Sequence, residues 1–123
     1  MYHREQDWVM RKIQVLVQFI ARIVFGKDHI SYEANEEQMG EMGGLYMRLK
    51  EMLATADICN AEDALHDGFN ESKDYLRLVM WFYDELNKMT DEALEASSFS
   101  REEIYEGLQD VLRRKGISLP TIL

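Results

Sequence analysis

The stretch DWVMRKIQVLVQFIARIVF, residues 7–25, constrains the fold of this chain more than any other part of it. Its apolar residues recur at the three- and four-residue spacing that is typical of one face of a helix. From Ile13 onward the apolar run is interrupted by polar residues placed four apart: Gln14, Gln18 and Arg22. A helix that is apolar over most of its circumference must be buried by several neighbours at once. We therefore expect residues 2–25 to form a central helix around which the rest of the domain packs.

The composition indicates one domain built from helices. The chain has 123 residues, of which 46% are apolar and 30% charged, enough to bury a single core without disulfides or metals. It has one proline, Pro120, and is rich in residues that favour helices. We predict a single helical domain over residues 1–123, in which residues 118–123 form a tail that either docks or stays loose.

Helical periodicity and capping signals divide the chain into five main helices and one short extra helix. Gly26 is placed to end the first helix. Ser100 and Glu103 form a capping box at the start of the last main helix, and Gly116 follows its end. The intervening helices are expected at residues 32–55, 58–69, 71–88 and 91–96. Because no sustained period-two alternation indicates strands, we predict an all-α helical bundle.

Three glycines, Gly40, Gly43 and Gly44, interrupt the helical pattern of residues 32–55. One interpretation is a close-approach surface, where a missing side chain lets a neighbouring helix lie against the backbone. The other is an irregular segment over residues 33–43 that precedes the true helix. On the close-approach interpretation, Gly44→Leu is expected to destabilise the domain by overpacking.

The charge distribution excludes some classes of partner. The net charge is −9, and the residues after position 30 carry nine basic and twenty acidic side chains. Because an acidic surface repels phosphate groups, we expect neither nucleic acid nor an anionic membrane as partner. The acidic run at residues 33–41 is interpreted as a solvated helix face, with a surface for cations or basic peptides as the alternative. A single cysteine, Cys59, and no recognisable secretory signal lead us to expect a reduced, cytoplasmic, soluble protein.

Two resemblances add to this interpretation. The segment LYMRLKEMLATADICNAEDAL, residues 45–65, resembles one tetratricopeptide-type helix pair, with Ala61 as the small residue at the crossing and Leu45 and Leu65 around it. It departs from that pattern at Leu49, where the repeat usually has a small residue, and no clear second copy follows. The segments HREQDW, VQFIA, ICNAE and FSREEI are similar to a family of small, uncharacterised helical proteins from Gram-positive bacteria. That resemblance implies a helical fold over most of the chain and no known activity.

No set of residues identifies a catalytic or metal centre. Asp63 and His66 have the spacing of half a carboxylate-bridged metal site, but the second pair that a di-metal bundle needs is absent from the sequence. We therefore expect a solvated His66, no metal and no cofactor. Cys59 is expected to be a small core residue rather than a reactive thiol.

We predict a small helical protein-interaction module without catalytic activity, acting on a protein partner or as a homodimer. The candidate contacts are two tryptophans at the edge of the apolar faces and one arginine: Trp8, Trp81 and Arg77. The alternative is a small-ligand carrier or enzyme with a pocket between helices near Gln14, Gln18 and Arg22. These three residues form a polar ribbon along the first helix, and its orientation separates the two hypotheses. A ribbon that faces solvent cannot line a closed pocket.

Overall fold

The structure, a computed structural model, describes residues 2–26 and 41–117, and in these ranges the side chains of Asp7–Gly26 and Met42–Ile117. The described residues form six helices and no strand, which confirms the predicted all-α fold. Nor does any described helix have the length and apolar character of a membrane span. The helices are α1 (Tyr2–Phe25), α2 (Glu41–Ala54), α3 (Ile58–Asp67), α4 (Lys73–Asn87), α5 (Asp91–Ala96) and α6 (Arg101–Arg114).

Side-chain caps begin three of these helices. The hydroxyls of Ser72, Thr90 and Ser100 each accept a hydrogen bond from the backbone N–H three residues later, as N-cap residues do. Asp57 stands before α3 without capping it and instead accepts from the side chain of Asn60 at 3.0 Å. The predicted helix over residues 32–55 is described only from residue 41, and residues 27–40, with Gly40 and most of the acidic run, lie outside the described residues.

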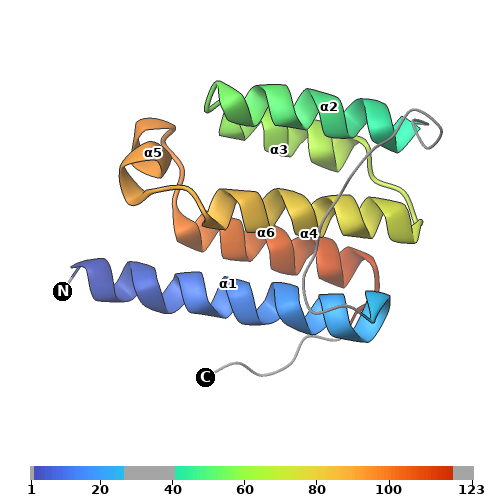
Figure 1. Cartoon of the computed structure of the whole chain (residues 1–123), viewed down its shortest axis with the longest axis horizontal. Helices are drawn as coiled ribbons and strands as arrows, with labels where there is room; N and C mark the ends of the chain where they lie inside the picture. Colours follow the sequence, from blue (N-terminus) through green and yellow to red (C-terminus); the bar gives the residue numbers. More distant parts are fainter. Residues whose placement is uncertain (1, 27–40, 118–123) are drawn as a thin grey trace.

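The central helix is α4, not α1. Figure 1 shows α4 between α2 and α3 on one side and α1 and α6 on the other. Nine residues of α4 are buried, including three large aromatics, Tyr75, Phe82 and Tyr83. Helices α1, α2 and α6 all pack against α4, whereas the main contacts of α1 are with α4 and α6. The domain is therefore organised around its fourth helix.

The outward side of α1 stays exposed. Ile13, Leu16 and Ile20 are buried, but Val15 is 48% exposed and Ile23 is 69% exposed. The prediction that α1 is buried around most of its circumference is therefore wrong for the single chain. The physical reason is that its two principal neighbours lie on the same side of it (Figure 1).

Neither interpretation of the glycines at the start of α2 holds at Gly44. The helix runs continuously through Gly43 and Gly44 from Glu41, so there is no break at these two residues. Gly44 is exposed, and a Cβ built on it would meet no atom within 4 Å. Close approach therefore does not explain Gly44, and the expected overpacking by Gly44→Leu is wrong.

The first and last helices end in left-handed glycines. Gly26 has a φ of +65° and Gly116 a φ of +75°, a region that favours glycine. After α6 the N–H of Ile117 donates to Leu112 at 2.9 Å, and the Ile117 side chain packs against the core. The glycines that end these two helices are the ones predicted from the sequence.

Helices α2 and α3 form an antiparallel pair whose core matches the residues of the predicted hairpin. Ala61 and Leu65 of α3 are fully buried, and Leu45 and Leu49 of α2 are buried with them. The two helices pack extensively against each other. The likeness of this pair to a tetratricopeptide repeat stays a prediction.

The buried guanidinium of Arg101 joins α4, α5 and α6. Arg101 is 3% exposed and donates to the backbone carbonyls of Asn87 and Met89, each at 2.8 Å. It also forms an ion pair with Asp91 at 3.0 Å. The Asn87 side chain in turn donates to the carbonyl of Met10 in α1 at 3.1 Å. The last backbone carbonyls of a helix have no hydrogen-bond partner within it. This network supplies donors to such carbonyls at the end of α4.

Candidate functional site

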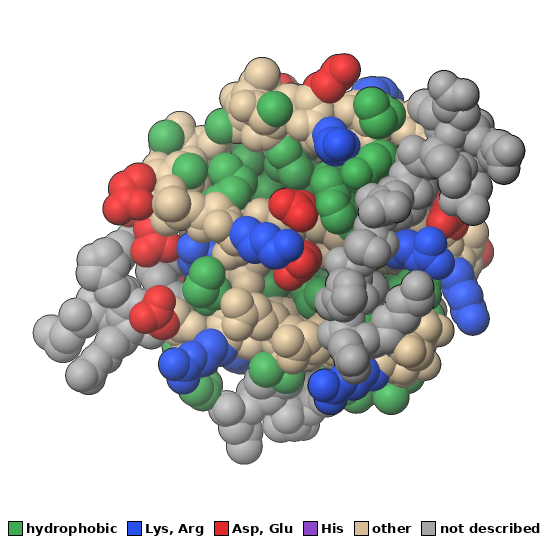
Figure 2. All heavy atoms as spheres, in the orientation of Figure 1, with side chains coloured by type: hydrophobic (Ala, Val, Ile, Leu, Met, Phe, Trp, Pro, Cys, Tyr) green, Lys and Arg blue, Asp and Glu red, His purple; other side chains and the backbone are tan. Residues whose placement is uncertain are grey.

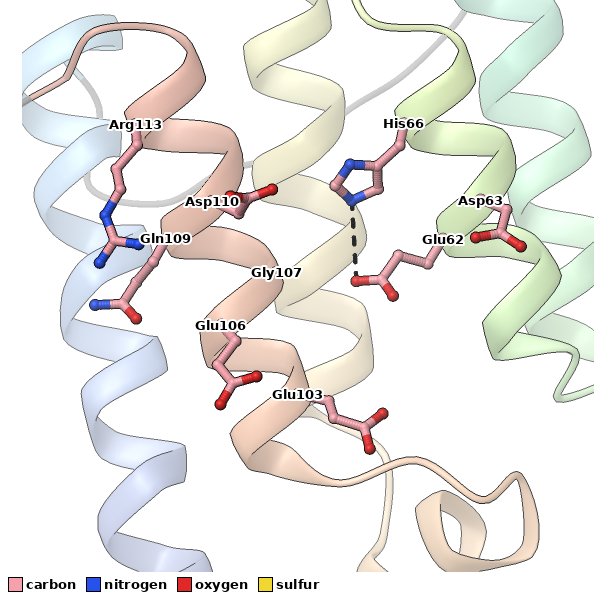
Figure 3. A pocket seen from close by; sticks show the side chains of 9 residues that line it. All are labelled: Glu62, Asp63, His66, Glu103, Glu106, Gly107, Gln109, Asp110 and Arg113. Carbon is pink, nitrogen blue, oxygen red and sulfur yellow. Dashed lines mark ion pairs between the residues drawn. The ribbon is translucent and has the colours of Figure 1, made fainter.

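An open groove of about 570 Å³ lies between α3 and α6. Figure 3 shows α4 behind it, with Glu62 and His66 pointing from α3 toward α6. Most of its lining is polar or charged, and the lining residues come from these two helices alone: Glu62, Asp63, His66, Glu103, Glu106, Gly107, Gln109, Asp110 and Arg113.

A hydrogen-bonded cluster forms the floor of the groove. The Tyr83 hydroxyl, from α4, donates to Glu62 Oε2 at 2.7 Å. His66 Nε2 lies 3.1 Å from the same hydroxyl, and Arg114 Nη1 lies 3.5 Å from His66 Nδ1. Because the only proton of the hydroxyl goes to Glu62, His66 must donate from Nε2 to the Tyr83 oxygen. Nδ1 is then the ring nitrogen that faces the Arg114 guanidinium.

Gly107 makes room for this cluster. A Cβ built on Gly107 would lie 2.5 Å from Glu62 Oε2 and 2.6 Å from the Tyr83 hydroxyl. Any larger residue would have to displace one of them. The glycine in the middle of α6 therefore allows the groove floor to be built from polar atoms of α3 and α4.

The electrostatics of the floor keep Tyr83 neutral. Burial and then the negative charge of Glu62 raise the pKa of Tyr83 far above its ordinary value of 10. The charge of Asp110, across the groove, acts in the same direction. A tyrosine in this state is a hydrogen-bond donor rather than a proton acceptor, so it orients the Glu62 carboxylate.

The mouth of the groove is acidic. Its lining holds five carboxylates, and four of them, Asp63, Glu103, Glu106 and Asp110, form no ion pair with another described residue. Glu103, Glu106 and Asp110 stand three and four residues apart on α6, where like charges destabilise a helix by some tenths of a kcal/mol. Figure 3 shows Arg113, the arginine of the lining, projecting from the side of α6 away from α3. Arg114 stands beside the floor, but these four acids of the mouth have no ion pair among the described residues.

The polar groups of the groove limit the chemistry that can be assigned to its described residues. Within the described residues, no three or more His, Cys, Asp and Glu side chains come together as a metal site. His66 and Glu62 are joined through the hydroxyl of a tyrosine with a raised pKa, which makes that hydroxyl a poor nucleophile. The groove instead offers several carboxylate oxygens to a positively charged ligand.

The sequence interpretation of His66 needs correction. His66 is partly buried and hydrogen-bonded, not solvated as expected, and the carboxylate of α3 that it approaches is that of Glu62, at 4.0 Å. Glu62 and His66 are four residues apart and so share a helix face, a signal available in the sequence. Gly107 in the middle of a strong helical pattern was a second signal. Tyr83 could not be found, because its position fits an apolar stripe equally well.

Trp81 lines a second, smaller hollow between α2 and α4. Its ring packs edge-on against Tyr46, with ring centres 4.8 Å apart. The hollow has a volume of about 300 Å³, and Figure 2 shows hydrophobic side chains gathered between these two helices. Its other lining residues include Lys50, Leu53 and Met89. Trp81 is thus a boundary aromatic, partly buried at the edge of the core.

The other two predicted contact residues lie elsewhere. Trp8 is 50% exposed on the outward side of α1. Arg77 lies over the ring of Phe25, 5.5 Å from its centre, and 4.0 Å from Asp74. Trp8 therefore lies on a different helix from Arg77 and Trp81, which are four residues apart on α4, and none of the three lines the groove between α3 and α6.

The polar ribbon of α1 faces outward. Gln14, Gln18 and Arg22 are all exposed, and neither of the two hollows described above includes them. The alternative of a carrier or enzyme with a pocket near these residues therefore loses the side chains on which it rested. The expectation for Cys59 is wrong, since its thiol is exposed at the start of α3.

The chain belongs to DUF6483, a family of unknown function, whose sequence model matches residues 3–116. No curated protein and no solved structure gives a significant match. This match confirms membership of a family of unknown function, and it supplies no activity.

Proposed function

We propose that this member of the DUF6483 family is a small protein-interaction module whose groove between α3 and α6 receives a basic segment of a partner protein. The observation that carries the proposal is the concentration of uncompensated carboxylates around a groove with a fixed floor. Lysine or arginine side chains entering it would be held by charge-assisted hydrogen bonds. Binding would also relieve the repulsion among the acids of α6.

The rigid floor supports a binding role. Glu62 is held by the Tyr83 hydroxyl and lies 4.0 Å from His66 Nε2, and the backbone of Gly107 stands close to its carboxylate. A preorganised carboxylate loses little side-chain entropy when a ligand binds. The mouth residues, in contrast, are exposed and can adapt to the ligand.

Two further features bear on the kind of protein and on its compartment. A helical hairpin of tetratricopeptide type, the likeness proposed for α2 and α3, usually belongs to a protein-binding scaffold. The single exposed cysteine fits a reducing compartment, and we propose a cytoplasmic setting on that ground.

Calorimetric titration with a tetra-arginine peptide tests the proposal. The variant Glu103→Gln/Glu106→Gln removes two charges from the groove mouth. Each exposed charge pair is worth roughly 0.2–1 kcal/mol, so we expect the variant to bind the peptide about two- to thirty-fold more weakly.

The control variant is Glu92→Gln/Glu51→Gln, which changes the net charge equally. Glu92 stands in the first turn of α5 as Glu103 does in α6, and Glu51 is an exposed residue of α2 outside the groove. We expect this control to bind nearly as the wild type does. Equal losses in both variants would show general attraction to an acidic protein and would contradict a specific groove.

A further inference from the structure

The His66 imidazole lies between a carboxylate and a guanidinium. Its Nε2 is 4.0 Å from Glu62 Oε2 of the same helix, and its Nδ1 is 3.5 Å from Arg114 Nη1 of α6. Histidine is the side chain whose charge ordinarily changes between pH 5 and pH 8. We propose that His66 makes the groove between α3 and α6 sensitive to pH, so that protonation of its ring releases Arg114 and weakens the binding of a basic ligand. This inference rests on the proposed function of the groove.

The hydrogen bonds of the floor fix where the added proton goes. The Tyr83 hydroxyl donates its proton to Glu62 at 2.7 Å, so its oxygen accepts from His66 Nε2 at 3.1 Å. Because Nε2 carries a proton in both states of the ring, protonation adds the second one at Nδ1. Burial and the charge of Glu62 raise the pKa of Tyr83, so its hydroxyl keeps its proton over the same pH range.

The contact between His66 and Arg114 belongs to one of the two states. A guanidinium has only hydrogen-bond donors, so it is held at Nδ1 by the lone pair of a neutral ring. The protonated ring presents an N–H and a positive charge to the guanidinium, and the two groups repel each other. Arg114 is exposed and lies over the Phe69 ring, 4.3 Å from its centre, so it can leave Nδ1 without disturbing the core.

Each of the two cations then has a carboxylate one turn away in its own helix. Glu62 and His66 are four residues apart on α3, so the charged ring pairs with a carboxylate that it already approaches. Asp110 and Arg114 are four residues apart on α6, and Figure 3 shows Asp110 on the side of α6 that faces His66. In both pairs the acid precedes the base, which is the more favourable order in a helix. Protonation of His66 therefore neutralises two carboxylates of the groove from within the chain.

His66 is the member of this cluster whose charge changes near neutral pH. The charged and titratable groups around it come from three helices: Glu62 and Asp63 of α3, Tyr75 and Tyr83 of α4, and Asp110, Arg113 and Arg114 of α6. Carboxylates, tyrosines and arginines ordinarily keep their charge between pH 5.5 and pH 7.5. A change in this range that depends on the cluster is therefore assigned to the imidazole.

Side-chain NMR of the ligand-free protein tests the switch itself. As the pH falls from 8 to 5.5, we expect the Arg114 Nε–H resonance to shift with the same midpoint as the His66 ring. His66→Gln keeps an amide that can donate to Tyr83 and accept from Arg114, so the Arg114 resonance should stay constant in this variant. An Arg114 resonance that does not follow the His66 ring overturns the proposal.

Calorimetric titration with the tetra-arginine peptide at pH 7.5 and pH 5.5 tests the effect on binding. Since two charge pairs form at the lower pH, we expect the wild type to bind the peptide about two- to ten-fold more weakly there. His66→Gln should bind equally at both pH values. Arg114→Gln keeps the pair of His66 with Glu62 and should show a smaller dependence on pH. The control His29→Gln, which removes another of the three histidines, should retain the dependence of the wild type.

The outcomes separate this inference from the proposed function. Binding at pH 7.5 that is unchanged at pH 5.5, or weakened equally in the wild type and His66→Gln, overturns the switch and leaves the proposed function intact. No binding at either pH overturns both. Circular dichroism at the two pH values accompanies each titration, and a loss of helicity in the wild type at pH 5.5 would assign the weaker binding to unfolding and overturn the switch.

Discussion

At the corner where α4, α5 and α6 meet, the Arg101 guanidinium supplies hydrogen-bond donors to the end of one helix and the start of another. Arg101→Met would remove these donors and leave the carbonyls of Asn87 and Met89 short of partners. We expect the free energy of unfolding to fall by about 2–4 kcal/mol, measured by urea denaturation. Arg113→Met, at an exposed position of α6, serves as the control, and a similar loss there would contradict the role of the corner.

Gly107 and Gly44 provide a matched pair of glycines within helices. Gly44→Ala adds a methyl group in open space, so we expect a gain of up to about 1 kcal/mol from helix propensity. Gly107→Ala brings the same methyl group against Glu62 and Tyr83, so we expect a net loss of about 1–3 kcal/mol despite that propensity. Thermal and urea denaturation of both variants measure the difference.

Combining Gly107→Ala with Tyr83→Phe checks the cause of that loss. Removing the hydroxyl opens space for the new methyl group, so the double variant should lose less than the sum of the two single variants. Strict additivity would show that the contact between Gly107 and the groove floor does not limit packing.

Two buried tyrosines make stability sensitive to alkaline pH. Burial raises the pKa of Tyr75 from 10.0 to about 12, and burial with Glu62 raises that of Tyr83 further. Below pH 10 both hydroxyls are protonated in the folded and the unfolded chain, so their stabilising contribution is complete. Above pH 10 the unfolded chain loses protons that the folded chain keeps, so the free energy of unfolding falls as pH rises toward 12.

Urea denaturation between pH 8 and pH 12 measures this dependence on pH. Tyr83→Phe is expected to be less stable at pH 8 and to lose stability less steeply above pH 10. The same steepness in variant and wild type would contradict a neutral Tyr83 in the groove floor.

On the scale of a helix, the two sides of α1 differ in how far their side chains are buried. Ile20 is fully buried and Ile23 is exposed, although both continue the same apolar pattern. We expect Ile20→Asp to abolish the cooperative melt, because an unpaired buried charge costs several kcal/mol against a total stability of about 5–15 kcal/mol. Ile23→Asp should melt within a few degrees of the wild type by circular dichroism. Equal effects would mean that α1 is enclosed in the single chain.

The helices themselves could be predicted from the sequence because their signals are local. Ser100 and Gly116 bound α6 as expected, and Thr90 starts the short α5. The choice of central helix failed, because periodicity reports how much of a helix is apolar and not how many neighbours the fold supplies. Residues of α4 such as Leu78 and Val79 are fully buried by α1, α2 and α6, a property of the packing of the whole chain.

Across the whole molecule, the position of the negative charge matters as well as its total. The sequence shows an acidic domain, from which we predict that nucleic acid and anionic membranes are not its partners. Its concentration between α3 and α6 depends on Glu62 and Asp110 facing each other across a gap, which no spacing in the sequence reveals. The candidate site was therefore missed, while Trp81 was correctly expected at the boundary of the core and Trp8 lies exposed outside it.

Amide chemical-shift mapping of the labelled protein during titration with a tetra-arginine peptide tests the central claim most directly. We expect saturable shifts that concentrate on the amides of α3 and α6 around Glu62, Gly107 and Asp110, with little change on α2 and α5. Shifts spread evenly over all acidic surfaces, or centred on α2 and α5, would contradict a binding groove between α3 and α6.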